Sequence, residues 1–437
     1  MSELPRPLAL ALRLCPEADE RVAARLWRER CWRKLLNYLW VEFLLARGSA
    51  RLWGGKPYWL TIDPTNFCQL HCPFCPTGAD RGVRDKASMS LAHFEKIMRV
   101  LGPAAVHLDL MNWGESLLHK DLPEMIACAK RHGVEVRLDA NLNDVSEAAL
   151  ERLILSGLDV LSASMDGLSP ETYGRYRAGG SFEKALGNLR ALIRKRRELG
   201  RANPWIIWQF LVFRHNEHEV ERVEAFAREV GVDQVGLTPA SLPDEPAYLW
   251  EWMARDERFR RYALPASEPP AERRESARSA AHVKKTPSSL AFHARRFDPK
   301  ELLTPRRLLD ALRWQDLPAL AARIRAVRAQ AERPAAAAGS AGRRVCKWPW
   351  AGVAVNPNGS VSPCCSVEDQ SDDLGNVFTQ SWSSLWSGSA YRRARRHVRR
   401  YVRGETDARP GSSHVCERCT IIGRANFQFP IKAEKAP

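Results

Sequence analysis

The chain has 437 residues, of which 45% are hydrophobic, so it is long enough to bury a large core and we expect two globular units. Its 67 Lys and Arg exceed its 51 Asp and Glu, which leaves a formal net charge of +16. This composition excludes a chain that is disordered throughout. The basic excess alone identifies no partner, because a solvated basic surface has the same composition as a patch that binds nucleic acid or anionic lipid.

The hydropathy pattern predicts no membrane-spanning helix. No stretch approaches the length of about 18 uncharged apolar residues that a span needs, and Arg13 interrupts the short apolar run at the start, so no signal peptide is expected either. We therefore expect a cytoplasmic protein, with association at a membrane surface as the alternative. Eleven cysteines in a reducing compartment are not expected to form a disulfide framework, so their spacing carries the information.

Residues 1–57 are predicted to form an amphipathic helical segment. Between Arg21 and Arg47, aromatic and aliphatic residues such as Trp32, Leu36 and Trp40 are mixed with basic residues. A basic amphipathic helix has two readings: it docks on the rest of the protein, or it contacts the surface of a membrane.

Repeated β-α units are predicted from Tyr58 to about Ser241, because short apolar runs alternate there with helical patterns. The predicted strands are Trp59–Ile62, Val106–Leu110, Val134–Leu138, Val160–Met165, Ile206–Phe213 and Val235–Leu237. Ser90 and Ser146 are the predicted N-caps of two intervening helices. Six units predict an α/β fold that is a partial (β/α)6 TIM-like barrel, with a lateral opening for substrate.

The rest of the chain changes in composition. Two stretches, Pro265–Ser289 and Glu332–Arg344, are rich in Pro, Ser, Ala and Arg and are predicted to be linkers, whereas Leu302–Ala331 is predicted to be helical. The segment 346–437 is rich in Cys, Trp and Gly, with few periodic apolar runs to form a core of its own. A metal cluster could supply the missing stabilisation.

Cys68, Cys72 and Cys75 lie on the loop after the first predicted strand, at the end of the barrel where such folds keep their active sites. Three thiolates at this spacing can hold three irons of a cubane cluster and leave the fourth iron for a small molecule. Zinc is the alternative, although three cysteines with no nearby fourth ligand do not complete a closed tetrahedral site.

This C-x3-C-x2-C loop, with Phe74 before its third cysteine, resembles that of the radical S-adenosylmethionine (SAM) superfamily. The resemblance implies a 4Fe-4S cluster that binds the methionyl group of SAM and cleaves it reductively. The resulting 5'-deoxyadenosyl radical would abstract a hydrogen atom from the substrate. It also implies that Phe74 lies beside the adenine.

Further segments of the barrel resemble SAM contacts of that superfamily. Trp113-Gly114-Glu115 is similar to its Gly-Gly-Glu segment, where a carboxylate accepts hydrogen bonds from the SAM amine and a glycine allows the backbone a close approach. Asn141 ends the third strand as in a related Thr-Asn-Gly pattern, with Ala140 and Leu142 in place of its neighbours. A turn with a solvated Glu115 is the structural alternative.

The fourth strand adds Ser164-Met165-Asp166-Gly167, followed by Tyr173 and Arg177, which is similar to the strand-four segment of the superfamily. By this resemblance Ser164 contacts the ribose side of SAM. Arg177 would pair with its carboxylate, as a guanidinium can do with two parallel hydrogen bonds.

A second group of cysteines follows near the C-terminus. Cys346 and Gly359-x4-Cys364, followed by Cys416-x2-Cys419, resemble the SPASM or twitch extension of radical SAM enzymes. Because the run after Cys419 lacks the further cysteines of a complete SPASM domain, we expect one auxiliary 4Fe-4S cluster, fully coordinated by protein, with a role in electron transfer or structure. Four cysteines would also satisfy zinc.

Four cysteines stand outside these assignments. Cys365 is the ligand in place of Cys364, a passive neighbour, or a hydrogen-atom donor of the kind that radical epimerases use. Cys15, Cys31 and Cys128 receive no chemical role, because free cysteine is commonly a small buried hydrophobe.

The resulting division is an N-terminal helical segment (1–57), a radical SAM core (58–245), a linker and helical insertion (246–345) and a SPASM/twitch-like auxiliary cluster domain (346–437). We expect a radical SAM enzyme that acts on a small-molecule, sugar or lipid substrate by oxidation, epimerisation or coupling. Its expected partners are that substrate, an electron donor such as flavodoxin or ferredoxin, and, as an alternative for the N-terminal helix, a membrane surface.

Three other functions are weighed against this one. A peptide-modifying maturase is an alternative, although about 57 residues before the barrel are short for a leader-binding domain. RNA modification is suggested by the seven arginines between Arg392 and Arg403, but no RNA-binding module with stacking aromatics is present, so nucleic acid is not expected as a partner. The third alternative is a non-catalytic iron-sulfur or zinc protein that acts as a scaffold. A scaffold does not need an iron with an open coordination position, which the three-cysteine loop would provide.

Overall fold

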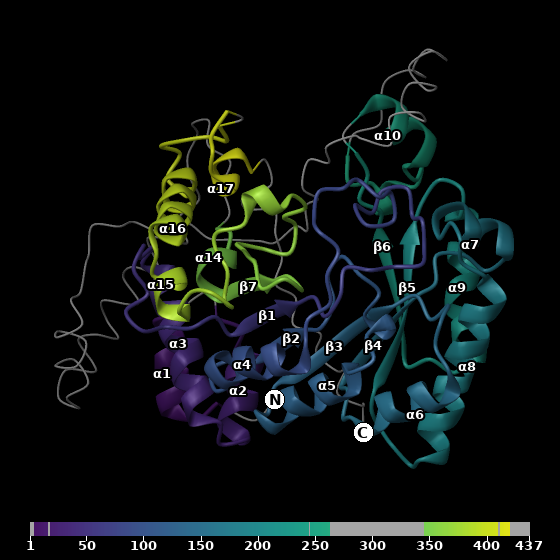
Figure 1. Ribbon diagram of the computed structural model, residues 1–437, viewed down its shortest axis with the longest axis horizontal. Helices are drawn as coiled ribbons and strands as arrows, with labels where there is room; N and C mark the ends of the chain where they lie inside the picture. The colour runs from purple at the N-terminus through teal and green to yellow at the C-terminus, as the bar shows by residue number, and fades with distance from the viewer. Residues whose placement is uncertain (1–3, 16–17, 244, 263–344, 410, 420–437) are drawn as a thin grey trace.

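A mixed sheet of eight strands organises the protein in the computed structural model, which describes residues 4–262 and 345–419 except 16–17, 244 and 410 (Figure 1). The strand order is β6-β5-β4-β3-β2-β1-β7-β8. The strands are β1 (Trp59–Ile62), β2 (His107–Asp109), β3 (Glu135–Ala140), β4 (Val160–Ser164), β5 (Trp205–Val212), β6 (Gln234–Pro239), β7 (Gly352–Val355) and β8 (Val361–Ser362). Strands β1 to β6 are parallel, which confirms the α/β fold with a partial barrel.

Each predicted barrel strand is present, and β1 has the predicted bounds. The other five differ from the prediction by one or two residues, β4 at its end only and the remaining four at both ends. Such short apolar runs form strands because the residues that face the helices are buried there, as on the covered face of a parallel sheet.

Helices cover one face of this sheet and connect its parallel strands (Figure 1). They are α4 (Leu91–Leu101), α5 (Leu122–Arg131), α6 (Glu147–Leu155), α7 (Pro170–Tyr176), α8 (Phe182–Glu198) and α9 (Val220–Val230). Ser90 and Ser146 cap α4 and α6 as predicted, because each hydroxyl accepts a hydrogen bond from a free backbone N–H of the first turn. Short 3-10 turns η1 (Ser116–Leu118) and η2 (Glu217–Glu219) complete the connections.

The N-terminal segment forms three helices: α1 (Arg6–Arg13), α2 (Glu20–Arg28) and α3 (Trp32–Ala46). The expectation of one helical stretch from Arg21 to Arg47 is therefore wrong at its middle. Arg30 has a left-handed φ of 56°, which ends α2 before α3 begins. Buried residues of all three helices belong to the main hydrophobic core, so the segment docks on the barrel.

The C-terminal segment builds directly on the barrel instead of forming a separate core. Strand β7 pairs in parallel with β1, from Trp59 opposite Gly352 to Ile62 opposite Val355, and β8 returns antiparallel to β7. The helices of this segment are α14 (Trp348–Ala351), α15 (Trp382–Trp386), α16 (Ser389–Val402) and α17 (Val415–Arg418), with the turn η4 (Gln370–Asp372). Buried Trp350 and Trp386 join the main core, so the barrel supplies the apolar surface that this segment lacks.

Two elements of the predicted insertion lie in the described residues: α10 (Pro246–Trp252) and η3 (Glu257–Phe259). The predicted linkers and the predicted helix Leu302–Ala331 lie outside the described residues. Among the described helices, none combines the length and the apolar character needed to cross a membrane.

Candidate active site

The loop that carries Cys68, Cys72 and Cys75 begins at the C-terminal end of β1, where strand ends of a parallel sheet meet. The loop is held in shape by its own backbone, since Cys75 N–H donates to the Cys72 carbonyl at 3.2 Å. His71 N–H donates to the Ala178 carbonyl at 2.7 Å, which fixes the loop to the chain that follows α7. The three cysteines share one apolar cluster with Phe74.

These thiols disfavour one another's ionisation. The pKa of Cys68 is raised to about 12, first by burial and then by the charges of Glu115, Cys75 and Cys72. The Leu70 N–H, which lies 3.5 Å from the sulfur, lowers this pKa in part. Burial also raises the pKa of Cys72. A cationic group bound to the thiols would offset both effects, because a coordinating thiol is deprotonated by its metal. The donor set therefore fits an iron cluster.

Gly114 and Glu115 lie directly against this loop. A Cβ atom on Gly114 would come within 1.7 Å of the Thr65 carbonyl oxygen, so only glycine fits there. The Glu115 N–H donates to the Phe67 carbonyl at 2.8 Å. This contact places the Glu115 carboxylate at the base of the cysteine loop.

Glu115 and Asn141 are linked to each other and to Cys68. The Glu115 carboxylate is buried and accepts hydrogen bonds from Asn141 N–H at 2.8 Å and Leu117 N–H at 3.1 Å. Burial raises the pKa of Glu115 to about 7, although these two hydrogen bonds lower it. The Asn141 side-chain amide lies 3.9 Å from the Cys68 sulfur. The structure therefore brings Gly114, Glu115 and Asn141 together with the cysteine loop.

Arg177 approaches the same loop from the end of α7. Its Nε donates to the Asp166 carboxylate at 2.6 Å, and its positive charge lowers the pKa of Cys72 against the effect of burial. Asp166 is fully buried and also accepts from Leu211 N–H at 2.6 Å. Asp166, which had no predicted role, thus fixes the guanidinium beside the cysteines. The sequence could have pointed to Asp166, because this residue lies within the Ser164–Gly167 segment that resembles the superfamily.

The two remaining predicted SAM contacts lie in different surroundings. Phe74 is only 2% exposed and packs among aromatic rings, with centroids 4.9 Å from Trp252, 5.5 Å from Tyr248 and 6.2 Å from Tyr176. Ser164 ends β4 opposite Gln209 and is partly exposed. Among the described residues, no hydrogen bond joins Ser164 to the cysteine loop, so its role stays a prediction.

The four C-terminal cysteines come together from three separate places: Cys346 precedes α14, Cys364 follows β8, and Cys416 and Cys419 lie in and after α17. The pKa of Cys346 is raised to about 12, first by burial and then by the charge of Cys419. The pKa of Cys416 is raised well above its ordinary value by burial and then by Cys419 and Cys346. These thiols therefore lie within electrostatic reach of one another, and as donors they fit a cluster bound by four cysteines.

Neither group of cysteines is arranged around a single ion. Within residues 4–262 and 345–419, apart from the few undescribed positions, no three Cys, His, Asp or Glu side chains are placed to hold one metal ion.

Cys364 and Cys365 have different neighbours. Burial is the largest cause of the raised pKa of Cys364, and the adjacent Cys365 is the next. The other thiols that raise this pKa are Cys416, Cys419 and Cys346. For Cys365 burial raises the pKa to about 12, and the next cause is the charge of Asp109 at the end of β2. The chain at Cys365 also touches the barrel, because Asn112 can donate to the Cys365 carbonyl at 3.1 Å.

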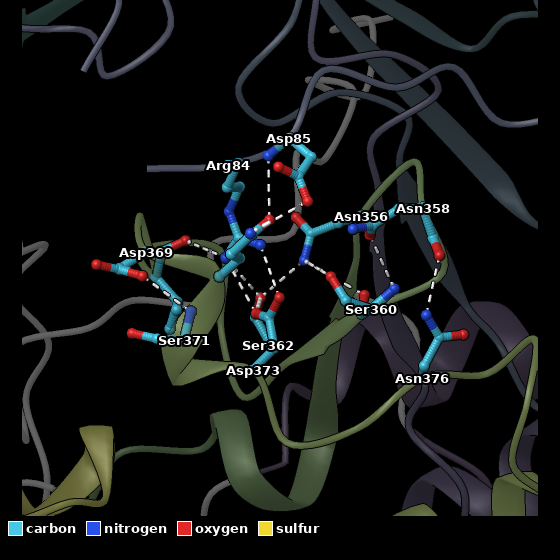
Figure 2. A network of polar contacts seen from close by, with 12 residues as sticks. Arg84, Asp85, Asn356, Asn358, Ser360, Ser362, Asp369, Ser371, Asp373 and Asn376 are labelled. Carbon is cyan, nitrogen blue, oxygen red and sulfur yellow. Dashed lines mark hydrogen bonds and ion pairs between the residues drawn. The ribbon is translucent and has the colours of Figure 1, made fainter. Parts of the chain in front are cut away.

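A polar network joins the segment after the cysteine loop to the hairpin that carries Cys364 (Figure 2). Arg84 donates to both carboxylate oxygens of Asp373, at 2.7 and 3.0 Å, and to Ser362 and the Val367 carbonyl. Both side chains of the Arg84–Asp373 pair are only 6% exposed. Gln370 accepts from Asp85 N–H at 3.0 Å. We call the contacts of Arg84 with Asp373 and Ser362, and of Asp85 with Gln370, the clamp. The sequence did not suggest the clamp, which fixes the two cysteine groups relative to each other.

The face of the sheet that is turned away from the helices is polar. Along β3, partly exposed Glu135, Arg137 and Asp139 alternate with three buried apolar residues. Arg137 Nε donates to Asp139 at 2.9 Å, and the two side chains remain 23% and 37% exposed although they lie deep in the protein. On closed barrels this inner face is filled with branched apolar side chains. Here it forms a polar lumen.

Neighbouring strands continue this polar lumen. Asp109 on β2 accepts from Trp59 Nε1 at 2.6 Å and contacts His107 Nε2 at 3.0 Å. Buried charges are costly unless they are paired, which explains these contacts. The lumen thus offers carboxylate and guanidinium groups below the cysteine loop.

Comparison with known proteins agrees with this architecture. Residues 62–227 match the Radical SAM superfamily, and residues 346–420 match SPASM, an iron-sulfur cluster-binding domain. SuiB of Streptococcus suis bound to the precursor peptide SuiA is similar in structure, with a TM-score of 0.50 and 12% identity over 89% of this chain and 75% of that chain. At this identity the likeness concerns the fold alone.

Two further solved structures are similar at lower scores. BtrN in complex with AdoMet and 2-DOIA has a TM-score of 0.37 and 12% identity over 84% of this chain and 92% of BtrN. Native anSMEcpe with bound AdoMet has a TM-score of 0.42 and 16% identity over 76% of this chain and 81% of that chain. From the family matches and the fold, we conclude that this chain belongs to the radical SAM superfamily and carries a C-terminal SPASM iron-sulfur domain.

Proposed function

We propose that this radical SAM enzyme cleaves SAM reductively at a 4Fe-4S cluster held by Cys68, Cys72 and Cys75, and that the 5'-deoxyadenosyl radical abstracts a hydrogen atom from a small-molecule, sugar or lipid substrate. The observation that carries the proposal is the convergence of these three thiols with Glu115, Asn141 and Arg177 at one end of the barrel.

The side chains around the loop suit the methionyl group of SAM. The Glu115 carboxylate would accept hydrogen bonds from the amine, and an ammonium partner would offset the burial that raises the pKa of Glu115 to about 7. Arg177, held by Asp166, would pair with the SAM carboxylate. Phe74 would lie beside the adenine, in the aromatic cluster that it shares with Trp252.

The polar lumen supports a substrate that carries hydroxyl or amino groups. An acyl chain would remove the remaining water from Arg137 and Asp139, which are 23% and 37% exposed, and would offer no partner to the donors and acceptors that their ion pair leaves over. A sugar, another polar small molecule, or the headgroup of a lipid would instead bond to them. Oxidation, epimerisation and coupling are all open to such a substrate.

The C-terminal group would hold one auxiliary 4Fe-4S cluster through Cys346, Cys364, Cys416 and Cys419. With four protein ligands it would serve electron transfer or structure, and an external donor such as flavodoxin or ferredoxin would supply the electrons. Cys365 is not a ligand in this set, and we propose it as a hydrogen-atom donor if the reaction is an epimerisation. Burial and, after it, the charge of Asp109 in the lumen raise the pKa of this thiol, which supports a position near the substrate.

The arginine run on α16 gives little support to RNA modification. Arg395 is buried and donates to the Pro349 carbonyl at 2.7 Å, while Arg393 pairs with Glu417 at 2.8 Å and Arg403 with Glu405 at 3.5 Å. Arginines in such contacts are less available to phosphates.

An anaerobic assay tests the proposal. The protein is reconstituted with iron and sulfide, reduced and given SAM, and 5'-deoxyadenosine is quantified for the wild type, for C68A/C72A/C75A, and for Cys128→Ala as a control that removes a buried thiol of α5. We expect the nucleoside from the wild type and from the Cys128 variant only. A wild type that is fully loaded with iron yet forms none would overturn the proposal and favour a scaffold.

A further inference from the structure

The outward face of α3 is apolar and is only partly covered. Trp40 and Phe43 on this face are half-buried and pack against the core, whereas Trp32 and Leu36 are exposed. The inward positions Leu35 and Val41 are buried in the core, as is normal for a docked helix. Trp32, Leu36, Trp40 and Phe43 repeat at intervals of four, four and three residues and so share another face of the helix. Trp32 is 46% exposed and Leu36 is 69% exposed.

The loop after α3 extends this surface. Gly55 lies close to both Val41 and Trp40, which places the loop against the helix. The same loop is fixed by Asn37, which exchanges two hydrogen bonds of 2.9 Å with the Lys56 backbone. Trp53 on this loop is 63% exposed. We call the five residues Trp32, Leu36, Trp40, Phe43 and Trp53 the α3 patch.

Basic side chains surround the α3 patch. From Trp27 to Lys56 the chain contains seven Lys and Arg and two Glu. One of the bases, Lys34, is buried and donates to the Gly133 carbonyl at 2.7 Å. One of the acids, Glu42, is buried in contacts with Tyr58 and Lys347. The guanidinium of Arg47 lies 5.0 Å from the Phe43 ring, and that of Arg51 lies 5.8 Å from the Trp53 ring.

More positive charge lies at both ends of the helix. Arg28, Arg30 and Arg33 are exposed near its start, and near its end Arg399 of α16 packs against Gly48. The surroundings of the patch are therefore strongly basic, with Glu29 as an exposed acid among them.

We propose that the α3 patch binds the surface of a lipid bilayer that contains anionic lipid. Indole rings are favoured at the boundary between headgroups and acyl chains, because one edge is polar and the rest apolar. Arginines around them are attracted to anionic headgroups while their methylenes cover apolar surface. An acidic protein partner would match the charges as well, but aromatic residues in a convex helical stripe suit the headgroup region of a bilayer.

Flotation with vesicles tests this inference independently of catalysis. The reconstituted full chain is mixed with vesicles of phosphatidylcholine alone or with about 30% phosphatidylglycerol, at low salt and at about 0.5 M salt. We expect binding to the anionic vesicles only, weakened by salt. W32S/L36S should weaken it about tenfold or more, because two apolar anchors are removed.

Two variants serve as comparisons. Leu155→Ser removes an exposed leucine that lies outside the α3 patch. Leu155 is 51% exposed and is the last residue of α6, so this variant should leave vesicle binding unchanged. R33E/R51E reverses charge around the patch without touching its apolar residues, so it keeps the test valid if W32S/L36S misfolds. It should also weaken binding about tenfold at low salt.

The inference is overturned if the wild type does not float with anionic vesicles, or if W32S/L36S and R33E/R51E bind as well as the wild type. It is also overturned if the patch variants abolish a dimer in sedimentation velocity while the wild type ignores vesicles, because a second copy of the chain is then the occupant. Loss of 5'-deoxyadenosine formation with intact vesicle binding would instead contradict the proposed function alone.

Discussion

The two cysteine groups reach proximity by different routes. The loop group, Cys68, Cys72 and Cys75, lies on one segment after β1, so the conformation of a single loop brings its thiols together. The C-terminal group draws its thiols from places as far apart as Cys346 and Cys419, and only the packing of α14, β8 and α17 brings them together. The first group depends on local structure and the second on the whole fold.

Their surroundings differ as well. Polar groups that can bind a small ligand, Glu115, Asn141 and Arg177, stand beside the loop group. The C-terminal thiols lie beside buried Tyr391, whose pKa is raised by burial first and by Cys416 and Cys364 in addition. This difference supports the proposal that the first group holds an open site and the second a closed one.

The largest expected effect comes from cutting the clamp between the two groups. Arg84→Ala leaves buried Asp373 without its ion pair, which typically costs about 3–5 kcal/mol of unfolding free energy. Arg228→Ala removes an exposed pair with Glu224 and should cost at most about 0.5 kcal/mol. Urea unfolding of both variants measures this contrast. Equal losses would show that the clamp does not stabilise the junction.

A smaller loss of unfolding free energy is expected from a side chain added at Gly114, against the loop group. Gly114→Ala forces the backbone away from the Thr65 carbonyl and should destabilise the protein by about 3 kcal/mol, with loss of SAM cleavage. Gly174→Ala, in α7, meets open space and should be neutral or stabilise by up to about 1 kcal/mol. Denaturation and 5'-deoxyadenosine assays on the pair check this. A fully active Gly114 variant would contradict the close approach.

The smallest effect is a pH dependence at the base of the loop group. Burial raises the pKa of Asp63 from 3.8 to about 7 although Trp113 N–H donates to it at 3.0 Å. The folded protein then holds a proton that the unfolded chain releases, so the stabilisation is complete below about pH 4 and is lost as the pH rises through about 7.

Asp63→Asn should therefore flatten the fall of unfolding free energy between about pH 5 and 7, by up to about 1.4 kcal/mol for each pH unit. Glu115, whose pKa is also raised to about 7, has the same sign and keeps part of the slope in the variant. Unfolding curves at several pH values measure this. Parallel pH profiles for the two proteins would contradict it.

Local patterns in the sequence predict the barrel well and its extensions poorly. Strand β1 and the caps Ser90 and Ser146 follow from apolar runs and neighbouring hydroxyls. The pairing of β7 with β1 joins segments nearly three hundred residues apart in the chain, and no local pattern encodes it. The break at Arg30 was not predicted, because a positive φ is unusual for arginine and neither glycine nor proline stands there to end the helix.

The candidate site shows the same division. The cysteine loop and Gly114-Glu115 were predicted from their motifs, and the structure brings them together. The clamp through Arg84 was missed because an arginine gains its role only from the partner that the fold supplies. The polar lumen had a signal in the sequence, since Glu135 and Arg137 alternate with apolar residues along the predicted strand Val134–Leu138, and Asp139 follows it directly. Apolar residues are the rule at such positions in a barrel.

The most direct test of the difference between the two groups is electron paramagnetic resonance of the reduced protein with and without SAM, for the wild type and C68A/C72A/C75A. If the loop group is open and the C-terminal group closed, SAM changes the signal of the wild type, while the variant keeps a signal that SAM leaves unaltered. A signal in the variant that responds to SAM, or no signal at all, would contradict this account.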